Sequence, residues 1–138
     1  MIQHVFTIKT PGRQLINITR EITNFVKNAK IATGLCNIFL HHTSASLIIC
    51  ENSDITVQED LENFMKRLAP DSSSQYAHSV EGPDDMPSHI RSVLTSNSIS
   101  VPITNHQLAL GTWQGIYVWE HRLASHERKI TATIIGEI

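Results

Sequence analysis

The chain has 138 residues, 41% of them apolar, and a formal net charge of −2. This size suits one domain that buries about two-thirds of its unfolded surface. The basic residues form no long stripe, which excludes a duplex nucleic-acid binder that depends on phosphate neutralisation. No apolar run is long enough to span a membrane, and the N-terminus has no signal-peptide apolar block, so we expect a cytoplasmic protein without a membrane segment.

The cysteine and histidine content indicates which side chains could bind a metal or react. The only two cysteines, Cys36 and Cys50, each lie in an apolar run, so we interpret them as small core residues in a reducing compartment. Histidine is frequent, with eight residues: His4, His41, His42, His78, His89, His106, His121 and His126.

The first half of the chain predicts strands around one helix. Residues 2–9 alternate in polarity and predict a strand. Residues 17–30 place apolar side chains on one helical face, with Asn17 as the expected N-cap. Two short strands should follow at 35–41 and 44–50, separated by a polar break.

A second helix and a long loop should come next. Thr56 and Glu59 form a potential capping box, with Thr56 as the N-cap, and Pro70 ends the helical pattern. Residues 71–85 are polar and loop-like. A loop of this length inside a compact domain is more often functional than idle.

A third helix should begin at Pro87, which suits a first helical turn, with Ile90, Val93 and Leu94 facing the core. Three strands should end the chain, at 98–103, 108–122 and 129–135.

The segment that follows the glycine-bracketed turn at 111–115 is apolar on both faces. Ile116 and Val118 alternate with Tyr117 and Trp119, so the two pairs point to opposite sides of a strand. A strand covered on both sides is expected at the centre of a sheet.

Five histidines are candidates for a metal site, which typically has three protein ligands and one open position. His41 and His42 are adjacent and point to opposite sides of an extended chain, so at most one can join a given site. His78 lies in the long loop, and His89 lies in the first turn of the third predicted helix, where the helix dipole disfavours imidazolium. His121 is a weaker candidate at the end of the central strand. A single histidine is more often a hydrogen-bonded structural residue than a ligand.

Several carboxylates are candidates for catalysis. Glu51 follows a strand end, and Asp60 lies off the apolar stripe of the second helix. Glu120 continues the apolar face of the central strand, where a carboxylate must ligate a metal, find a partner or emerge at the sheet edge. A salt bridge from Glu120 to Arg122 or Arg128 is the structural alternative.

Five ordered motifs resemble those of the YjbQ-like family, whose members are often labelled secondary thiamine-phosphate synthase enzymes. The resemblance covers essentially the whole chain. The motifs are His42-Thr43-Ser44-Ala45-Ser46, Glu51-Asn52-x-Asp54-x-x-Val57-x-x-Asp60, His78-x-x-Glu81-Gly82, Ser88-His89-Ile90 and Leu110-Gly111-Thr112-Trp113-Gln114-Gly115-Ile116.

The resemblance implies a single α+β domain over residues 1–138, with a largely antiparallel sheet or sandwich flanked by two or three helices. It also implies a homotrimer and a three-histidine metal site at His42, His78 and His89. The implied activity is thiamine-phosphate synthesis.

Our first hypothesis is a metal-dependent enzyme that acts on a small phosphorylated substrate, with a divalent metal, preferably zinc, held beside the Trp113 bend. The catalytic carboxylate would be Glu51, Asp60 or Glu120. The substrate-binding residues would be Thr43, Ser44, Thr112, Gln114 and Arg122. Because a three-histidine site suits zinc better than magnesium, hydrolysis fits the ligands at least as well as pyrophosphate chemistry.

Two alternatives remain open. The chain could be a non-enzymatic trimeric module that binds a metal or ligand, or the polar motifs could only join subunits.

Overall fold

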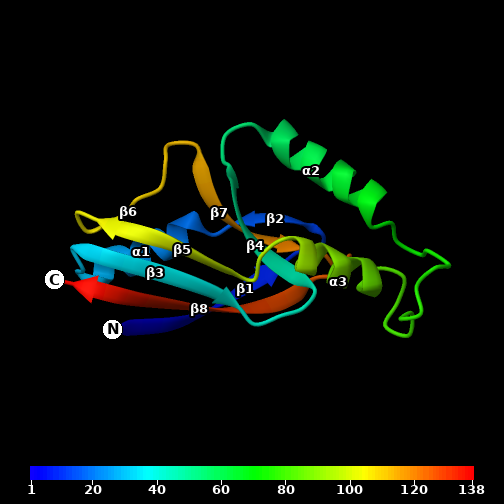
Figure 1. Ribbon diagram of the computed structural model, residues 1–138, viewed down its shortest axis with the longest axis horizontal. Helices are drawn as coiled ribbons and strands as arrows, with labels where there is room; N and C mark the ends of the chain where they lie inside the picture. Colours follow the sequence, from blue (N-terminus) through cyan, green and yellow to red (C-terminus); the bar gives the residue numbers. More distant parts are fainter.

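Two antiparallel sheets face each other in the computed structural model, which describes residues 1–138 (Figure 1). The larger sheet has the strand order β1 (Ile2–Thr10), β8 (His126–Glu137), β3 (Thr33–Leu40), β5 (Ser98–Thr104) and β6 (Gln107–Leu108). The smaller sheet has the order β2 (Gln14–Asn17), β7 (Gln114–Glu120) and β4 (Ala45–Glu51). With three helices, this architecture confirms the α+β expectation.

The core lies between the two sheets and under α1 (Thr19–Ala29). In both sheets, every second side chain along a strand points inward, and these inward side chains form the apolar core. The larger sheet contributes Ile38 and Ile134, the smaller sheet contributes Val118, and α1 contributes Ile22 and Val26, all fully or almost fully buried. Burying each such side chain contributes roughly 1.5–3 kcal/mol.

Strand β7 lies at the centre of the smaller sheet, between β2 and β4, as predicted. Ile116 and Val118 face the core, while Tyr117 and Trp119 are buried on the opposite face. The Trp119 indole donates a hydrogen bond from Nε1 to Glu62 Oε2 at 3.0 Å, which anchors α2 (Ile55–Leu68) on that second face. The predicted strand at 108–122 is too long at both ends, because β7 spans only Gln114–Glu120.

Three details of the helix ends and strands differ from the predictions. Asp54 caps α2 by accepting a hydrogen bond from the Thr56 amide, so Thr56 is not the N-cap; a carboxylate two residues earlier reaches the same free amides. Ile18 occupies the N-cap of α1, although Asn17 Oδ1 still accepts from the Thr19 amide. The short strand β2 was not predicted, since four residues carry too little periodicity.

Helix α3 (Asp85–Leu94) starts two residues before Pro87, so His89 belongs to its second turn. A proline is tolerated anywhere in a first turn, because the first amides of a helix have no partner within the helix. The prediction of its buried face was wrong for Val93 and Leu94, which are exposed, while Ile90 is half-buried. The fully buried side chains are Ser88 and Arg91. The Arg91 guanidinium pairs with Glu62, so this helix packs through a buried ion pair.

The fold gathers polar side chains at one end of the smaller sheet. Strand β7 ends and β4 begins there, and α3 packs against β4 (Figure 1). The loop between α2 and α3 reaches the same end. None of the three helices has the length and apolar character that crossing a membrane requires.

Candidate metal site

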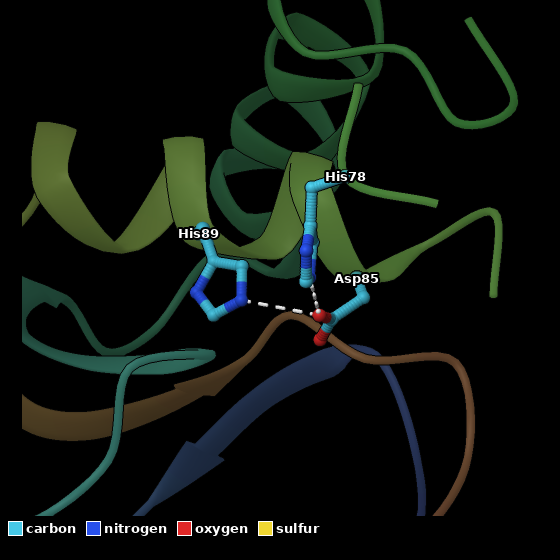
Figure 2. A group of neighbouring side chains, drawn as sticks. All are labelled: His78, Asp85 and His89. Carbon is cyan, nitrogen blue, oxygen red and sulfur yellow. Dashed lines mark hydrogen bonds and ion pairs between the residues drawn. The ribbon is translucent and has the colours of Figure 1, made fainter. Parts of the chain in front are cut away.

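Three metal-ligating side chains converge at the start of α3. Asp85 opens the helix and His89 lies one turn later on the same face, while His78 comes from the preceding loop. Asp85 Oδ2 is 2.6 Å from His78 Nε2 and 3.1 Å from His89 Nε2. Figure 2 shows both rings directed at this one carboxylate. One ligand atom from each residue lies within 4.8 Å of the other two.

The hydrogen bonding of His89 shows what the group can hold. Its Nδ1 is 3.0 Å from the Thr43 carbonyl oxygen, which can only accept, so Nδ1 carries the proton. In the neutral ring, Nε2 then presents a lone pair to the Asp85 carboxylate. Two acceptors at 3.1 Å need a proton or a cation between them. The donor set therefore fits a bound cation, and the Thr43 carbonyl fixes the ring orientation as partners of metal-binding histidines do.

Arg122 holds the Asp85 carboxylate in place. Its Nη1 donates to Asp85 Oδ1 at 2.9 Å, its Nε donates to Asp84 Oδ2 at 3.0 Å, and its Nη2 donates to the Glu81 carbonyl at 3.0 Å. Burial raises the pKa of Asp85, but the hydrogen bond from His78 and the charges of His89 and Arg122 outweigh it, so the pKa is lowered. Asp85 therefore stays ionised, as a metal ligand must.

Two imidazoles and one carboxylate form a recognised ligand set. Catalytic zinc sites use three protein ligands of this kind and leave a further position for water or substrate. Magnesium and calcium prefer all-oxygen sites, so the imidazoles favour zinc or another transition metal.

The structure brings together two of the three predicted ligands and places His42 outside the group. His42 Nε2 accepts a hydrogen bond from the Lys129 amide at 2.8 Å, so this nitrogen is engaged by strand β8. Burial and then the charge of Arg128 lower the pKa of His42, despite the opposing effect of Glu120. Asp85, and not His42, is the third potential ligand that lies within 4.8 Å of His78 and His89.

Glu120 forms the buried salt bridge that was the alternative to a catalytic role. Its Oε1 accepts hydrogen bonds from Arg128 Nε at 2.8 Å and from Thr10 Oγ1 at 2.7 Å. Burial raises the pKa of Glu120, but the hydrogen bonds from Arg128 and Thr10 lower it further, so the net shift is downward. Ser44 also serves this network, because its Oγ accepts from Arg128 Nη2 at 3.0 Å.

Three predicted residues lie at the other end of the smaller sheet: Glu51, Thr112 and Gln114. Glu51 pairs with Gln114, whereas Ala45 pairs with Glu120, so six residue steps separate the two ends. At about 3.3 Å per residue, that distance is roughly 20 Å. Glu51 Oε2 accepts two backbone amides of its own turn. The group of His78, Asp85 and His89 is therefore not beside the exposed Trp113 bend. The prediction of a metal site beside that bend was wrong.

Asp60, the remaining predicted carboxylate, is exposed on α2, and its side chain makes no hydrogen bond. The backbone carbonyl of Thr43, in contrast, contacts His89, one of the three potential metal ligands. The sequence reasoning missed Asp85, although its spacing of four residues to His89 places both on one helical face.

This arrangement defines a class of protein: an α+β domain of two antiparallel sheets with a candidate metal site of two histidines and one aspartate at a helix start. Residues 4–137 match the family model described as UPF0047 protein YjbQ-like, and the chain belongs to this family. The sequence resemblance is thereby confirmed.

Relatives and solved structures agree over the whole length. A UPF0047 protein from Synechocystis sp. is 47% identical over 99% of this chain and 92% of its own, and UPF0047 protein YjbQ from Escherichia coli O157:H7 is 41% identical over 98% of both. A hypothetical protein from Aeropyrum pernix K1 superposes with a TM-score of 0.90 at 25% identity, covering 99% of this chain and 100% of its own. A yjbq/upf0047 family protein from Clostridium acetobutylicum gives 0.88 at 33% identity, covering 96% and 99%.

Proposed function

We propose that His78, Asp85 and His89 bind one divalent cation, with zinc preferred, and form the active site of an enzyme that hydrolyses a small phosphorylated or related ester substrate. The observation that carries this proposal is the convergence of His78 Nε2, Asp85 Oδ2 and His89 Nε2, which lie within 4.8 Å of one another. A cation bound among these three atoms would replace the His78 and His89 contacts to Asp85 with ligand bonds.

Each residue has a defined task in this proposal. A bound zinc ion supplies Lewis-acid activation of water and of the substrate oxygen. Arg122 keeps Asp85 oriented and ionised, and the Thr43 carbonyl selects the His89 tautomer with a free Nε2. His78 is the most exposed of the three ligands, with 45% of its side chain accessible, so it leaves the site open on the loop side.

Hydrolysis is favoured over pyrophosphate release because protein groups already engage two buried or half-buried arginines, the predicted substrate-binding residue Arg122 and Arg128. Every nitrogen of the Arg122 guanidinium already donates to an acceptor of the protein, and Arg128 is engaged by Glu120 and Ser44. Neither can form the bidentate contact that recognises a pyrophosphate without breaking these bonds. The thiamine-phosphate synthase activity implied by the family label stays a prediction.

The test is metal-dependent turnover of chromogenic esters: p-nitrophenyl phosphate, bis-p-nitrophenyl phosphate and p-nitrophenyl acetate. Zinc-loaded protein should hydrolyse at least one of them, and chelation or Asp85→Ala should abolish turnover. Asp60→Ala, which removes an exposed carboxylate from α2, should leave it unchanged. Equal turnover by the chelated protein would rule out the proposal. Zinc binding without turnover of any ester would favour the non-enzymatic metal-binding alternative.

We also propose that the chain assembles as a homotrimer. What supports this is the outer face of the larger sheet, where no helix lies over the exposed apolar side chains Val5, Leu35 and Phe39. Exposed apolar patches of this kind mark association surfaces. Light scattering should give a mass near three times 15.5 kDa, and a monomer mass would refute the proposal.

A cytoplasmic location is the last part of this proposal. Cys36 and Cys50 are both free thiols, which suits a reducing compartment. Burial raises the pKa of Cys36 to about 11, so this thiol is unreactive. Fractionation of the native cells should recover the protein with cytoplasmic markers, and recovery with envelope fractions would contradict this location.

A further inference from the structure

A cavity of about 490 Å³ opens beside His89 and extends along the C-terminal half of α3 towards the start of β4. His42 and Thr43 line its β4 side, and residues from the end of α3 and the following turn line the other. No aspartate, glutamate, lysine or arginine lines the cavity. Since His89 belongs both to this cavity and to the metal group, a ligand held at the metal has the cavity as neighbouring space.

Three of the four hydroxyl groups that line the cavity, all except that of Thr43, have already used their protons. Ser92 Oγ donates to the Ala45 carbonyl at 3.2 Å, Thr95 Oγ1 donates to the Arg91 carbonyl at 2.7 Å, and Ser96 Oγ donates to the Ser98 carbonyl at 2.6 Å. A hydroxyl that donates to a carbonyl keeps only oxygen lone pairs for a ligand. These three groups can therefore only accept hydrogen bonds from a ligand.

The position of the cavity at a helix end adds to this preference. Ser92 is in the last turn of α3, and Thr95 is its C-cap. The C-terminus of a helix carries a partial negative charge from its free carbonyl groups, which attracts cations and hydrogen-bond donors and repels anions.

His42 adds no positive charge that would offset the partial negative charge of the α3 C-terminus. Its Nε2 accepts from the Lys129 amide, so the ring is neutral and its one proton lies on Nδ1. Burial and the nearby Arg128 keep the pKa of His42 below its usual value. The cavity thus presents three hydroxyls that can only accept and no cation, while Thr43, Asn97 and His42 keep donors of their own. The preference against an anion therefore comes from the helix C-terminus and the absence of a cation.

We infer that this cavity binds the organic part of the substrate through a hydrogen-bond-donating group, an amine or a hydroxyl, and rejects an anionic group. The inference rests on the proposed function, because the reacting ester group must occupy the metal site next to the cavity. It adds the chemical class of the remainder of the substrate: an ester of an amino alcohol or a polyol, and not one that carries a second phosphate or a carboxylate.

The test uses hydroxamates, which anchor on zinc, with tails of matched length. The three probes are γ-aminobutyric hydroxamate with an amine tail, valeric hydroxamate with a methyl tail and succinic monohydroxamate with a carboxylate tail. Calorimetry on the zinc-loaded protein measures each dissociation constant. The amine tail should bind about tenfold more tightly than the carboxylate tail, with the methyl tail between them, as one charge-assisted contact predicts.

Val93→Lys supplies the decisive variant. Val93 lines the cavity and is 82% exposed, so a lysine there adds a cation without disturbing the core. The order of the amine and carboxylate probes should invert in this variant. Leu94→Lys is the matched control: it adds the same charge at the next residue of α3, which is 55% exposed and does not line the cavity. The control should keep the wild-type order.

The outcomes separate the two proposals. A wild type that binds zinc and the three hydroxamates equally, or prefers the carboxylate tail, overturns this inference and leaves the metal site intact. An inversion that occurs equally in Leu94→Lys also overturns it, since the effect would then be long-range charge. A wild type that takes up no zinc in a prior metal titration overturns the proposed function, and this inference with it.

Discussion

Acidification should destabilise this protein through His121, which is fully buried directly after the end of β7. His121 Nε2 lies 2.8 Å from Ser46 Oγ, and Nδ1 has no hydrogen-bond partner. Burial, followed by the charges of Arg91, Arg13 and Arg128, lowers the pKa of His121 to about 3. The folded state therefore keeps this ring neutral at a pH where an exposed histidine is protonated.

The sign and magnitude follow from that difference. The unfolded chain binds a proton at His121 below a pKa of about 6.5, while the folded chain does so only near 3, so stability is complete above pH 6.5 and is lost as the pH falls. Between pH 7.5 and pH 4.5 the free energy of unfolding should fall by roughly 2.5 kcal/mol from this residue alone. Carboxylates whose pKa values are lowered, such as Glu120 and Asp85, act mainly below this window.

Urea denaturation at half-unit pH steps measures this loss. The variant His121→Gln places an amide near Ser46 without a titratable ring, so its stability should change with pH by roughly 2.5 kcal/mol less than that of the wild type over the same window. The other histidines are common to both proteins and cancel in the comparison. Parallel pH profiles for the two proteins would refute the reasoning.

Two further substitutions probe the ion pairs around the site. Arg122→Ala removes the guanidinium donors that hold Asp84 and Asp85, so zinc affinity should fall about 10–100-fold in a competition titration with a chelating dye, and unchanged affinity would contradict its positioning role. Glu120→Gln leaves the buried Arg128 without a charged partner and should cost about 3–5 kcal/mol of unfolding free energy by urea denaturation. The exposed control Glu59→Gln should stay within about 0.5 kcal/mol of wild type, and a similar small effect of Glu120→Gln would contradict the burial argument.

Local patterns in the sequence were sufficient for the elements that carry the core. The alternation around Ile116 and Val118 predicted a central strand, and β7 occupies that position because both of its faces are covered. The prediction failed where polar contacts replaced apolar ones. The end of α3 looked like a core-facing stripe, but that helix packs through Arg91 and Ser88, leaving Val93 in solvent.

The candidate site was predicted in part, because its geometry depends on long-range register. His78 and His89 were identified correctly as neighbours, whereas Asp85 was assigned to the loop since the helix start was placed at Pro87. With the helix started at Asp85, the four-residue spacing to His89 would have been visible. The exclusion of His42 could not be deduced locally, because it depends on the Lys129 amide of strand β8.

The central claim is that one cation binds to the group of His78, Asp85 and His89. Protein stripped with a chelator, dialysed against excess zinc and then freed of loosely bound ions should contain one zinc per chain by elemental analysis. The same treatment of Asp85→Ala should leave essentially none, while Asp60→Ala should match the wild type. Equal zinc in wild type and Asp85→Ala, or none in the wild type, would contradict the account.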